Sequence, residues 1–338
     1  MSTEHDCTVI RLGPITKHPD ADSLSITEVD GRPCIIRTGE WAEGDIPVYV
    51  PIDSVVPTGD ARFAFLASKA KSDGNYRVRA MRLRGVFSMG LLVRPEPDMI
   101  EGEEVRERIG VTVYEPPEDG GNGSIEAGQM ERDPGFLPVY DIESLRKWQC
   151  VLEDGEEVVL TEKVHGANGR FAFHNGRLWV ATRTTFRKLV DEVGEGSMWS
   201  KVAADLDLER RLGAFPGFAV YGEVYGQVQD LRYGVGVGGR GARLVVFDIL
   251  EIATRRWLDY DEQLAMAAAM GLPTVPMLYR GPWSPELMSH AEGATVLGNG
   301  THVREGFVLR PVKERVHPRL GRVLLKMHGQ GYLLRKGG

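Results

Sequence analysis

The sequence predicts an α+β protein of two domains, the first of which is a small β-barrel. Three observations lead to this prediction. The chain of 338 residues is longer than one ordinary domain. Its N-terminal third consists of short strand-like runs punctuated by Gly, Pro and Asp. An acidic, Gly- and Pro-rich stretch then precedes a part in which strand-like runs alternate with a few helices.

The predicted barrel at residues 1–114 rests on the alternation of polar and apolar residues. Leu24–Val29 alternates in this way, and so does Tyr76–Ala80. A period of two places every second side chain on the same face of a strand. Several such short strands with turn residues between them are typical of a small barrel.

The stretch 115–134 opens with EPPEDGGNGS and contains few apolar residues, which is typical of an exposed linker. We therefore assign residues 135–338 to the second domain. Its strand-like runs include Arg177–Thr182 and Leu244–Leu250. Together with the helices predicted between such runs, they give this domain its α+β character.

One helix of the second domain has clear ends in the sequence. Asp259 is a good N-cap residue, and Glu262 stands three residues later, as in a capping box. Gly271 and then Pro273 follow the helical run and predict its end.

The composition places the protein in the cytoplasm. No run reaches the roughly 20 apolar residues that a membrane span needs, and the start, MSTEHD, is polar and acidic where a signal peptide is basic and then apolar. Cys7, Cys34 and Cys150 are odd in number and far apart, which favours reduced thiols over disulfides or a zinc site. We expect a cytoplasmic monomer with no membrane contact.

The charge is unevenly distributed. A formal net charge of -7 by itself argues against a nucleic-acid partner, because phosphate binding depends on clustered Lys and Arg. However, nine basic residues and only two glutamates follow residue 300. A second basic cluster consists of Arg77, Arg79, Arg82 and Arg84. For each cluster, a solvated strand face and a phosphate-binding surface are both open interpretations.

The most informative segment is TEKVHGAN, at Thr161–Asn168, which lies between two apolar strand-like runs. A lysine followed by His, a tight-turn Gly and Asn resembles the nucleotidyl-transfer motif of the covalent nucleotidyltransferases, which include DNA ligases, RNA ligases and mRNA capping enzymes. Singly, such residues are more often surface lysines, strand ends or core aromatics. Four later segments resemble the other motifs of this superfamily in the same order: Thr182–Thr184, Tyr221–Glu223, Val246–Ile249 and Arg304–Arg310.

The resemblance implies an adenylation domain of antiparallel sheets with flanking helices, in which Lys163 attacks ATP and becomes linked to AMP. A lysine amine attacks phosphorus only when it is deprotonated, so the site must favour the neutral amine. Charge on the phosphates calls for Mg²⁺ or Mn²⁺ with oxygen ligands. By the resemblance, Glu305 and Glu223 hold metal-bound waters, and Glu223 accepts a hydrogen bond from the ribose.

The remaining roles also come from the resemblance. Phe247 stacks on the adenine, and Glu162 lines the base pocket. His165 and Asn168 lie beside the phosphates of the nucleotide. Arg183 supplies a two-pronged donor for the 5′-phosphate of the nucleic acid, which Asn168 also contacts.

The last basic motif departs from the usual pattern. Lys326, in the run VLLK, resembles the lysine that engages the α-phosphate. The superfamily has a second lysine one residue away, and here either Leu324 or His328 takes that place, depending on the alignment. Asp248, next to Phe247, is expected to be structural and held inward on its strand.

Two features favour an RNA ligase within the superfamily. DNA ligases and capping enzymes usually have Asp at the position of His165, whereas His-Gly-x-Asn resembles the nick-sealing RNA ligases. Only twelve residues follow Lys326, so we expect no C-terminal OB-fold domain. Instead, three N-terminal segments resemble the OB-like module of the Deinococcus-type RNA ligases, which precedes the catalytic domain: His18–Ser23, Val48–Ser54 and Arg82–Leu92.

By this resemblance the substrate is a nicked duplex whose 3′-OH strand ends in RNA. The alternatives are an ATP-dependent DNA ligase, a capping-type guanylyltransferase and, outside enzymes, an OB-fold protein that binds RNA or tRNA. The last does not account for Lys163 and its companion motifs. The run Gly236–Gly241 fits the GxGxxG dinucleotide pattern, but a strand-like run follows it where that pattern needs a helix, so we expect a loop.

Overall fold

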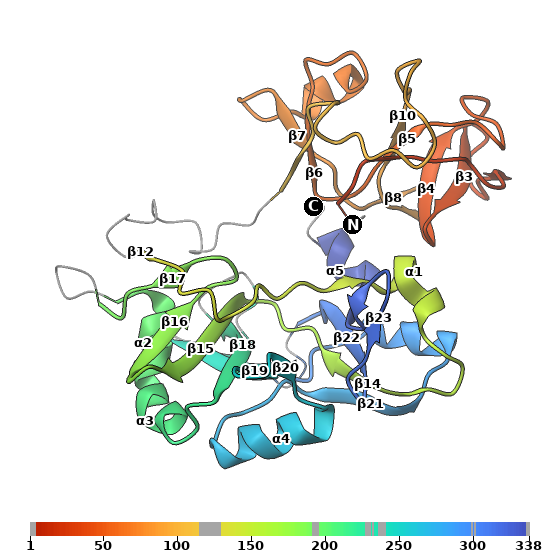
Figure 1. Ribbon diagram of the computed structural model, residues 1–338. Coiled ribbons are helices and arrows are strands. Elements are labelled where there is room, and N and C mark those ends of the chain that lie inside the picture. Colours follow the sequence, from red (N-terminus) through yellow and green to blue (C-terminus); the bar gives the residue numbers. More distant parts are fainter. Residues whose placement is uncertain are drawn as a thin grey trace. The chain divides into compact units, whose positions relative to one another are not determined.

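The computed structural model describes residues 5–114, 130–190, 196–226, 231, 233–235, 241–298, 300 and 302–335. The predicted α+β class is confirmed (Figure 1). The chain forms two compact units. Unit 1 comprises Met1–Pro116, Glu143–Cys150 and Gln330–Gly338, and unit 2 comprises Pro117–Ile142 and Val151–Gly329.

The predicted domain division at residues 114 and 135 stays a prediction. Two short segments that it assigns to the second domain, 143–150 and 330–338, group with unit 1. Most of the predicted linker, residues 115–129, lies outside the described residues. Met130–Glu131, near its end, is strand β12 and pairs with Phe186–Arg187, so this part belongs to a sheet.

Unit 1 consists of short antiparallel ladders around an apolar core, as predicted for its barrel. The predicted strand Leu24–Val29 is confirmed as β3, whereas only the first part of Tyr76–Ala80 is in a strand. Val48, Val56 and Phe63 are fully buried in its core. Three sheets have three strands each, in the orders β1 (Thr8–Val9), β5 (Val48–Val50), β10 (Leu91–Val93), then β11 (Thr112–Val113), β6 (Ser54–Pro57), β7 (Asn75–Arg77), and β2 (Thr16–Lys17), β3, β4 (Arg32–Arg37). The fourth sheet is the hairpin of β8 (Met81–Leu83) and β9 (Val86–Ser88).

The β8–β9 hairpin is fixed from two sides within unit 1. His18 is fully buried; its Nε2 lies 3.0 Å from the Leu83 carbonyl, and its Nδ1 accepts a hydrogen bond from the Asp20 amide. Leu333 of the helix α5 packs with the hairpin core around Phe87. The other elements of unit 1 are η1 (Ala64–Lys69), β13 (Glu143–Ser144), α1 (Leu145–Trp148), η3 (Gln149–Val151, whose last residue belongs to unit 2) and α5 (Gln330–Arg335).

Unit 2 contains a long antiparallel sheet with helices on one face (Figure 1). Trp199 and Leu212, from the two helices, are fully buried against Phe171 and Val220 of the sheet. The strands follow the order β12, β17 (Phe186–Arg187), β16 (Arg177–Ala181), β15 (Ala167–His174), β18 (Phe218–Gly226), β19 (Ala242–Glu251) and β20 (Arg256–Trp257), and the helices are α2 (Met198–Asp205) and α3 (Leu208–Gly213).

A second antiparallel sheet of unit 2 carries the segment before Lys163. Its central strand β14 has an apolar, fully buried run at Val158–Leu160. Within this sheet the strands β25 (Leu325–His328), β22 (Gly306–Pro311), β14 (Glu157–Glu162) and β21 (Met277–Pro282) lie side by side in this order. Unit 2 also contains η4 (Pro285–Ala291) and a hairpin formed by β23 (Val316–His317) and β24 (Gly321–Arg322).

The predicted helix after Asp259 is confirmed. Helix α4 (Tyr260–Ala269) begins with a capping box between Asp259 and Glu262, whose carboxylate accepts the Asp259 amide at 3.0 Å. Gly271 has φ of +66°, which favours glycine, and so ends the helix as predicted.

Other sequence expectations can be compared with the described residues. All three cysteines are free thiols; Cys7 and Cys34 are buried and Cys150 is exposed. No helix in the described part of the chain has the length and apolar character that crossing a bilayer requires.

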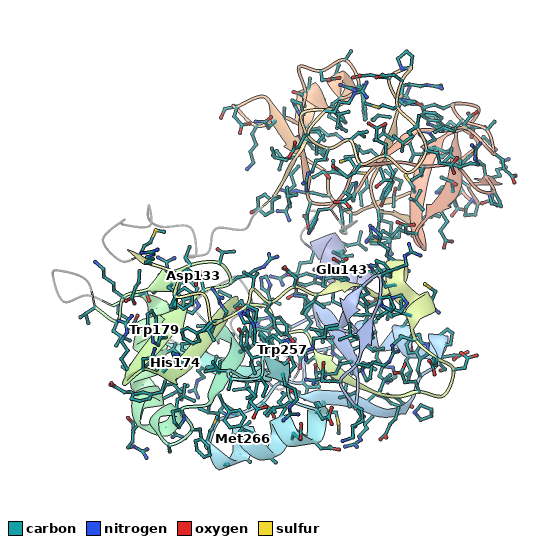
Figure 2. The ribbon with its side chains drawn as sticks, in the orientation of Figure 1. Asp133, Glu143, His174, Trp179, Trp257 and Met266 are labelled. Atoms are coloured by element: carbon teal, nitrogen blue, oxygen red, sulfur yellow. The ribbon has the colours of Figure 1, made fainter. Side chains whose placement is uncertain are left out.

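In the β15–β16 hairpin the Trp179 indole donates to the His174 carbonyl at 3.1 Å (Figure 2).

A buried ionic network joins the two sheets of unit 2. Asp248 of β19 is completely buried, and its Oδ1 lies 3.3 Å from Nη1 of Arg310 in β22. Its Oδ2 accepts from Arg322 at 2.6 Å and from the Tyr140 hydroxyl at 2.7 Å. Glu314 pairs with both arginines. Asp248 is therefore structural, as expected from the sequence.

Three arginines of the basic excess after residue 300 are internal to the fold. Arg310 is 3% exposed, and Arg322 is half-buried in the same network. Arg315 pairs with Glu156 and donates to the Val151 carbonyl. These arginines hold unit 2 together, so their charges do not form a phosphate-binding surface.

Asp248→Ala should lower the free energy of unfolding by about 3–5 kcal/mol, because it removes the buried carboxylate that pairs with both guanidinium groups and leaves Glu314 alone to balance their two charges. Urea denaturation followed by tryptophan fluorescence measures this change. Asp261→Ala is the matched control: Asp261 pairs with Arg280 at the surface, where such a pair contributes at most about 1 kcal/mol. Equal losses in the two variants would contradict a stabilising role for the network.

Candidate active site

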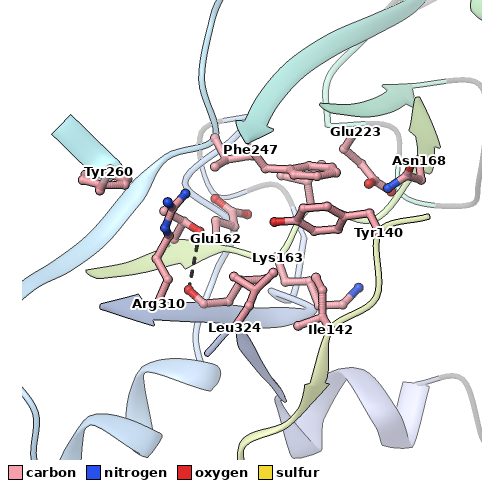
Figure 3. A pocket seen from close by; sticks show the side chains of 14 residues that line it. Tyr140, Ile142, Glu162, Lys163, Asn168, Glu223, Phe247, Tyr260, Arg310 and Leu324 are labelled. Atoms are coloured by element: carbon pink, nitrogen blue, oxygen red, sulfur yellow. Dashed lines mark hydrogen bonds between the residues drawn. The ribbon is translucent and has the colours of Figure 1, made fainter. Parts of the chain in front are cut away.

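A pocket opens between the two sheets of unit 2 (Figure 3). It encloses about 650 Å³ of empty space, its open mouth included. Its lining combines apolar side chains with a few charged ones: Tyr140, Ile142, Thr161, Glu162, Lys163, Val164, Asn168, Glu223, Phe247, Tyr260, Val275, Val308, Arg310 and Leu324.

Lys163 lies where the chain crosses from one sheet to the other. Strand β14 ends at Glu162, and β15 of the other sheet begins at Ala167. The Lys163 amide donates to the Gly306 carbonyl at 3.0 Å, which fixes the backbone at the crossing. Gly166 is required there because a Cβ at this position would lie 2.3 Å from the Val224 carbonyl oxygen.

The Lys163 ammonium forms an ion pair with Glu305, with Nζ 2.7 Å from Oε1. The pairing of β14 with β22 places Glu162 opposite Phe307, and so brings Glu305, two residues before Phe307, close to Lys163. His165 Nδ1 lies 3.2 Å from the other carboxylate oxygen, and His328 Nε2 lies 3.6 Å from the first. The Lys163, His165 and Glu305 predicted from the sequence therefore meet in one cluster.

Two glutamates of the site have opposite pKa shifts. Burial alone would raise the pKa of Glu305, but Lys163 and the hydrogen bonds with His165 and His328 hold it well below its usual range. Burial raises the pKa of Glu223 to about 8, opposed by Lys163 and reinforced by Glu305. At neutral pH the site therefore holds one ionised carboxylate and one that is mostly protonated.

Two buried acceptor atoms of the site have no hydrogen-bond partner among the described residues: Glu162 Oε1 and Asn168 Oδ1. The other oxygen of Glu162 accepts the amides of Val296 and Leu297 at 2.9 Å each, which fixes the carboxylate in place. Buried polar atoms are nearly always satisfied, so two unsatisfied acceptors around one pocket indicate a site built for a polar ligand.

A β-bulge directs Phe247 into the pocket. Across β18 and β19, Tyr221 pairs with Asp248 and Gly222 pairs with Val246, which leaves Phe247 without a partner. A bulge of this kind re-aims the side chain of the extra residue. Gly222 faces the bulge, and a Cβ there would lie 2.6 Å from a Leu244 methyl group. The predicted Phe247 thus reaches the pocket through an irregularity in its strand.

The other predicted residues differ in their relation to the pocket. Asn168 and Glu223 are direct partners across β15 and β18, and both line it. Lys326 is half-buried on β25, opposite Val308 of the lining. Arg183 is exposed, does not line the pocket and pairs with Asp141.

The structure distinguishes the two candidates beside Lys326. Leu324 is 3% exposed and belongs to the apolar lining of the pocket. His328 shares its strand with Lys326 and faces Glu305, and burial lowers its pKa. Of the two, His328 is the polar group at the site.

Sequence reasoning missed two tyrosines of the site. The Tyr233 hydroxyl accepts the His165 amide at 2.6 Å, and the Tyr140 ring lines the pocket. Tyr140 stands shortly after the predicted linker, outside every recognised motif. No sequence signal connects it with the pocket, because its position depends on contacts with distant strands.

Comparison with known proteins agrees with this geometry. The class of protein that the fold defines is a ligase domain preceded in the chain by an N-terminal barrel. The chain belongs to the RNA ligase family, whose model matches residues 156–328, more than half of its length. The model of an OB-fold domain matches residues 7–95, which confirms the predicted N-terminal OB-like module. No curated protein sequence matches the chain.

Solved structures show the same fold over the whole chain. An RNA ligase mutant of Naegleria gruberi with ATP and Mn matches with a TM-score of 0.83 at 23% identity, over 99% of this chain and 100% of that chain. The N. gruberi RNA ligase with PPi matches with 0.82 at 23% identity, over 98% and 99%. A mutant with AMP and Mn gives 0.82 at 23% identity, over 97% and 98%.

Glu223→Gln should make stability less dependent on pH. The folded-state pKa of about 8 lies above the ordinary value of 4.5, so the folded protein keeps a proton that the unfolded chain releases. The protonated Glu223 carboxyl therefore stabilises the fold fully below pH 4.5, and this contribution is lost as the pH rises towards 8. Between these values the free energy of unfolding falls by at most about 1.4 kcal/mol per pH unit. Denaturation of wild type and variant at pH 5 to 8, with a chelator, measures the difference. Glu209→Gln, on the exposed side of α3, is the control, and parallel profiles for Glu223→Gln and wild type would contradict the shift.

Proposed function

We propose that this protein is an ATP-dependent RNA ligase that carries AMP on Lys163 and seals 3′-OH/5′-phosphate nicks in duplexes whose 3′-OH strand ends in RNA. The observation that carries the proposal is the Lys163 ammonium, at a pocket lined by an aromatic ring and unsatisfied acceptors. Membership of the RNA ligase family supports it.

The pocket suits an adenine nucleotide. Phe247 offers a ring on which a purine stacks, and Val308 adds an apolar surface. Glu162 Oε1 is free to accept a hydrogen bond from the exocyclic amine of adenine, whereas guanine presents a carbonyl at that position. Glu223 hydrogen-bonds the ribose, and Asn168 lies beside the phosphates. The N. gruberi RNA ligase structures hold ATP or AMP with Mn, which agrees with this assignment.

A divalent cation, Mg²⁺ or Mn²⁺, also fits the residues present. Glu305 and Glu223 present carboxyl oxygens close enough to interact with each other, and His165 Nδ1 lies 3.2 Å from Glu305 Oε2. These two carboxylates would hold the cation through its waters, as hard cations prefer oxygen ligands. When bound, the cation neutralises charge on the phosphates.

The chain's own residues then perform three steps. The neutral Lys163 amine attacks the α-phosphorus of ATP, a nitrogen–phosphorus bond forms, and pyrophosphate leaves. Lys326, His165 and His328 are the cationic or polar groups near that phosphate. The AMP next passes to the 5′-phosphate of the nick. Attack by the 3′-OH forms the phosphodiester and releases AMP.

Nucleic-acid contacts come from Asn168 at the pocket and from groups outside it. Arg183 is exposed and offers two donors to a 5′-phosphate once its pair with Asp141 opens. Arg82 and Arg84 are exposed on the β8–β9 hairpin of the OB-fold unit. OB folds commonly bind nucleic acid, so this unit supplies the contacts with the duplex backbone.

Lys163→Ala should abolish transfer of label from [α-³²P]ATP to the protein, because no other group replaces the attacking amine. Lys163→Arg should be equally inactive, since a guanidinium keeps the charge beside Glu305 but is not nucleophilic at neutral pH. Denaturing gels of the labelled protein measure the reaction. Lys201→Ala, in an exposed position of α2, is the matched control and should label like wild type. Strong labelling of either Lys163 variant would overturn the assignment of the nucleophile.

A nicked duplex with an RNA 3′-OH end should be sealed faster than the same nick with a DNA 3′-OH end, by roughly tenfold or more, as a lost hydrogen bond to the 2′-OH predicts. Gel assays with pre-adenylated 5′ ends isolate the final step. In an accompanying test, GTP replaces ATP in the labelling reaction, and the protein should then take up no label. Preference for a DNA 3′ end would point to a DNA ligase, and GTP labelling to a capping-type enzyme.

A further inference from the structure

One wall of the pocket is a segment without helix or strand, Leu137–Ile142, which we call the strap. Tyr140 and Ile142 of the strap line the pocket, whereas Val139 between them is 48% exposed and does not. Figure 3 shows the Tyr140 ring beside the Phe247 ring. The strap belongs to unit 2, like the rest of the pocket, and to no motif recognised in the sequence.

The strap is anchored to the long sheet through its backbone. The buried Arg170 of β15 donates from Nη1 to the Leu137 carbonyl at 2.8 Å. The Tyr221 hydroxyl, on β18, donates to the Pro138 carbonyl at 2.9 Å. Both donors are buried, and such hydrogen bonds are costly to leave unmade. The backbone of the strap is therefore held in one position before the chain reaches Tyr140.

Tyr140 itself is held at both ends of its ring. Its hydroxyl donates to Oδ2 of Asp248 at 2.7 Å, and Asp248 is the next residue in the chain after Phe247. Its ring centroid lies 4.8 Å from that of Phe247 and 5.3 Å from that of Trp257. Tyr140 is 6% exposed. One side chain thus contacts the stacking ring directly and also holds the residue beside it.

We propose that Tyr140 is a positioning residue for the nucleotide: it fixes the angle at which Phe247 presents its ring to the base. This inference rests on the proposed function, because it takes the pocket to hold ATP. Phe247 has no partner in the ladder, so the ladder constrains it less than its neighbours. The contact with Tyr140 supplies the missing constraint. Without this contact the Phe247 ring can move in the free protein. That freedom is lost when a base binds, and its loss weakens the affinity for the nucleotide.

The inference predicts a change in ATP affinity without a change in chemistry. Calorimetry of ATP and Mg²⁺ binding in a Lys163→Ala background excludes turnover. There, Tyr140→Leu should raise the Kd for ATP about tenfold, as expected when an aromatic contact is lost. Tyr140→Phe keeps the ring and should raise it about threefold. Val139→Ser, the neighbouring exposed residue, should leave it unchanged. With Lys163 intact, Tyr140→Leu should raise the ATP concentration for half-maximal labelling and keep the maximal rate.

Unchanged Kd values for both Tyr140 variants would overturn the inference, and so would a lower maximal rate with an unchanged Kd. Thermal melting shows whether Tyr140→Leu folds. If it does not, Tyr140→Phe decides: a raised Kd supports the tether to Asp248, and an unchanged Kd refutes it. Failure of the Lys163→Ala protein with Tyr140 intact to bind ATP would contradict the proposed function and this inference with it. The two failures are thus distinguishable.

Discussion

One buried carboxylate, Asp248, links the two sheets that form the walls of the pocket. Asp248 belongs to β19 of one sheet, and Arg310, which it binds, belongs to β22 of the other. With Arg322 and Glu314 the cluster contains two acids and two bases, so its formal charges balance. Buried ion pairs add little net stability, because desolvation offsets their attraction. What such a network supplies is a fixed geometry, and here it fixes the spacing of the sheets.

The same network shows where several basic residues of this acidic protein lie in the fold. A large positive excess near the C-terminal end looks, in sequence, like a phosphate-binding surface. In the fold, Arg310, Arg315 and Arg322 bind carboxylates or backbone carbonyls inside unit 2. Other guanidinium groups remain exposed, among them Arg82 and Arg84 on the β8–β9 hairpin and Arg183. Sequence position alone cannot separate the two uses of arginine, because pairing depends on which strands become neighbours.

The sequence predicted the order of motifs, and strand register converted that order into proximity. Lys163, Glu305, Glu223 and Asn168 meet because β14 pairs with β22 and β15 pairs with β18. The irregularity at Phe247 was not predictable, since the sequence gives no sign of the β-bulge that leaves this residue without a partner in the ladder. Tyr140 was not predictable either. Its place is set by hydrogen bonds to Arg170, Tyr221 and Asp248, which are distant in sequence and carry no local signal.

The opposite pKa shifts of Glu305 and Glu223 suit a site that must receive a polyanion. If both were ionised, two negative charges would face the incoming phosphates beside one ammonium. Burial instead keeps Glu223 mostly protonated at neutral pH, while Lys163 and His165 keep Glu305 ionised. The Lys163–Glu305 pair is then close to neutral, and the Glu223 carboxyl can donate a hydrogen bond rather than repel. A cation arriving with the nucleotide would favour ionisation of Glu223, which links the charge state of the site to the presence of its substrate.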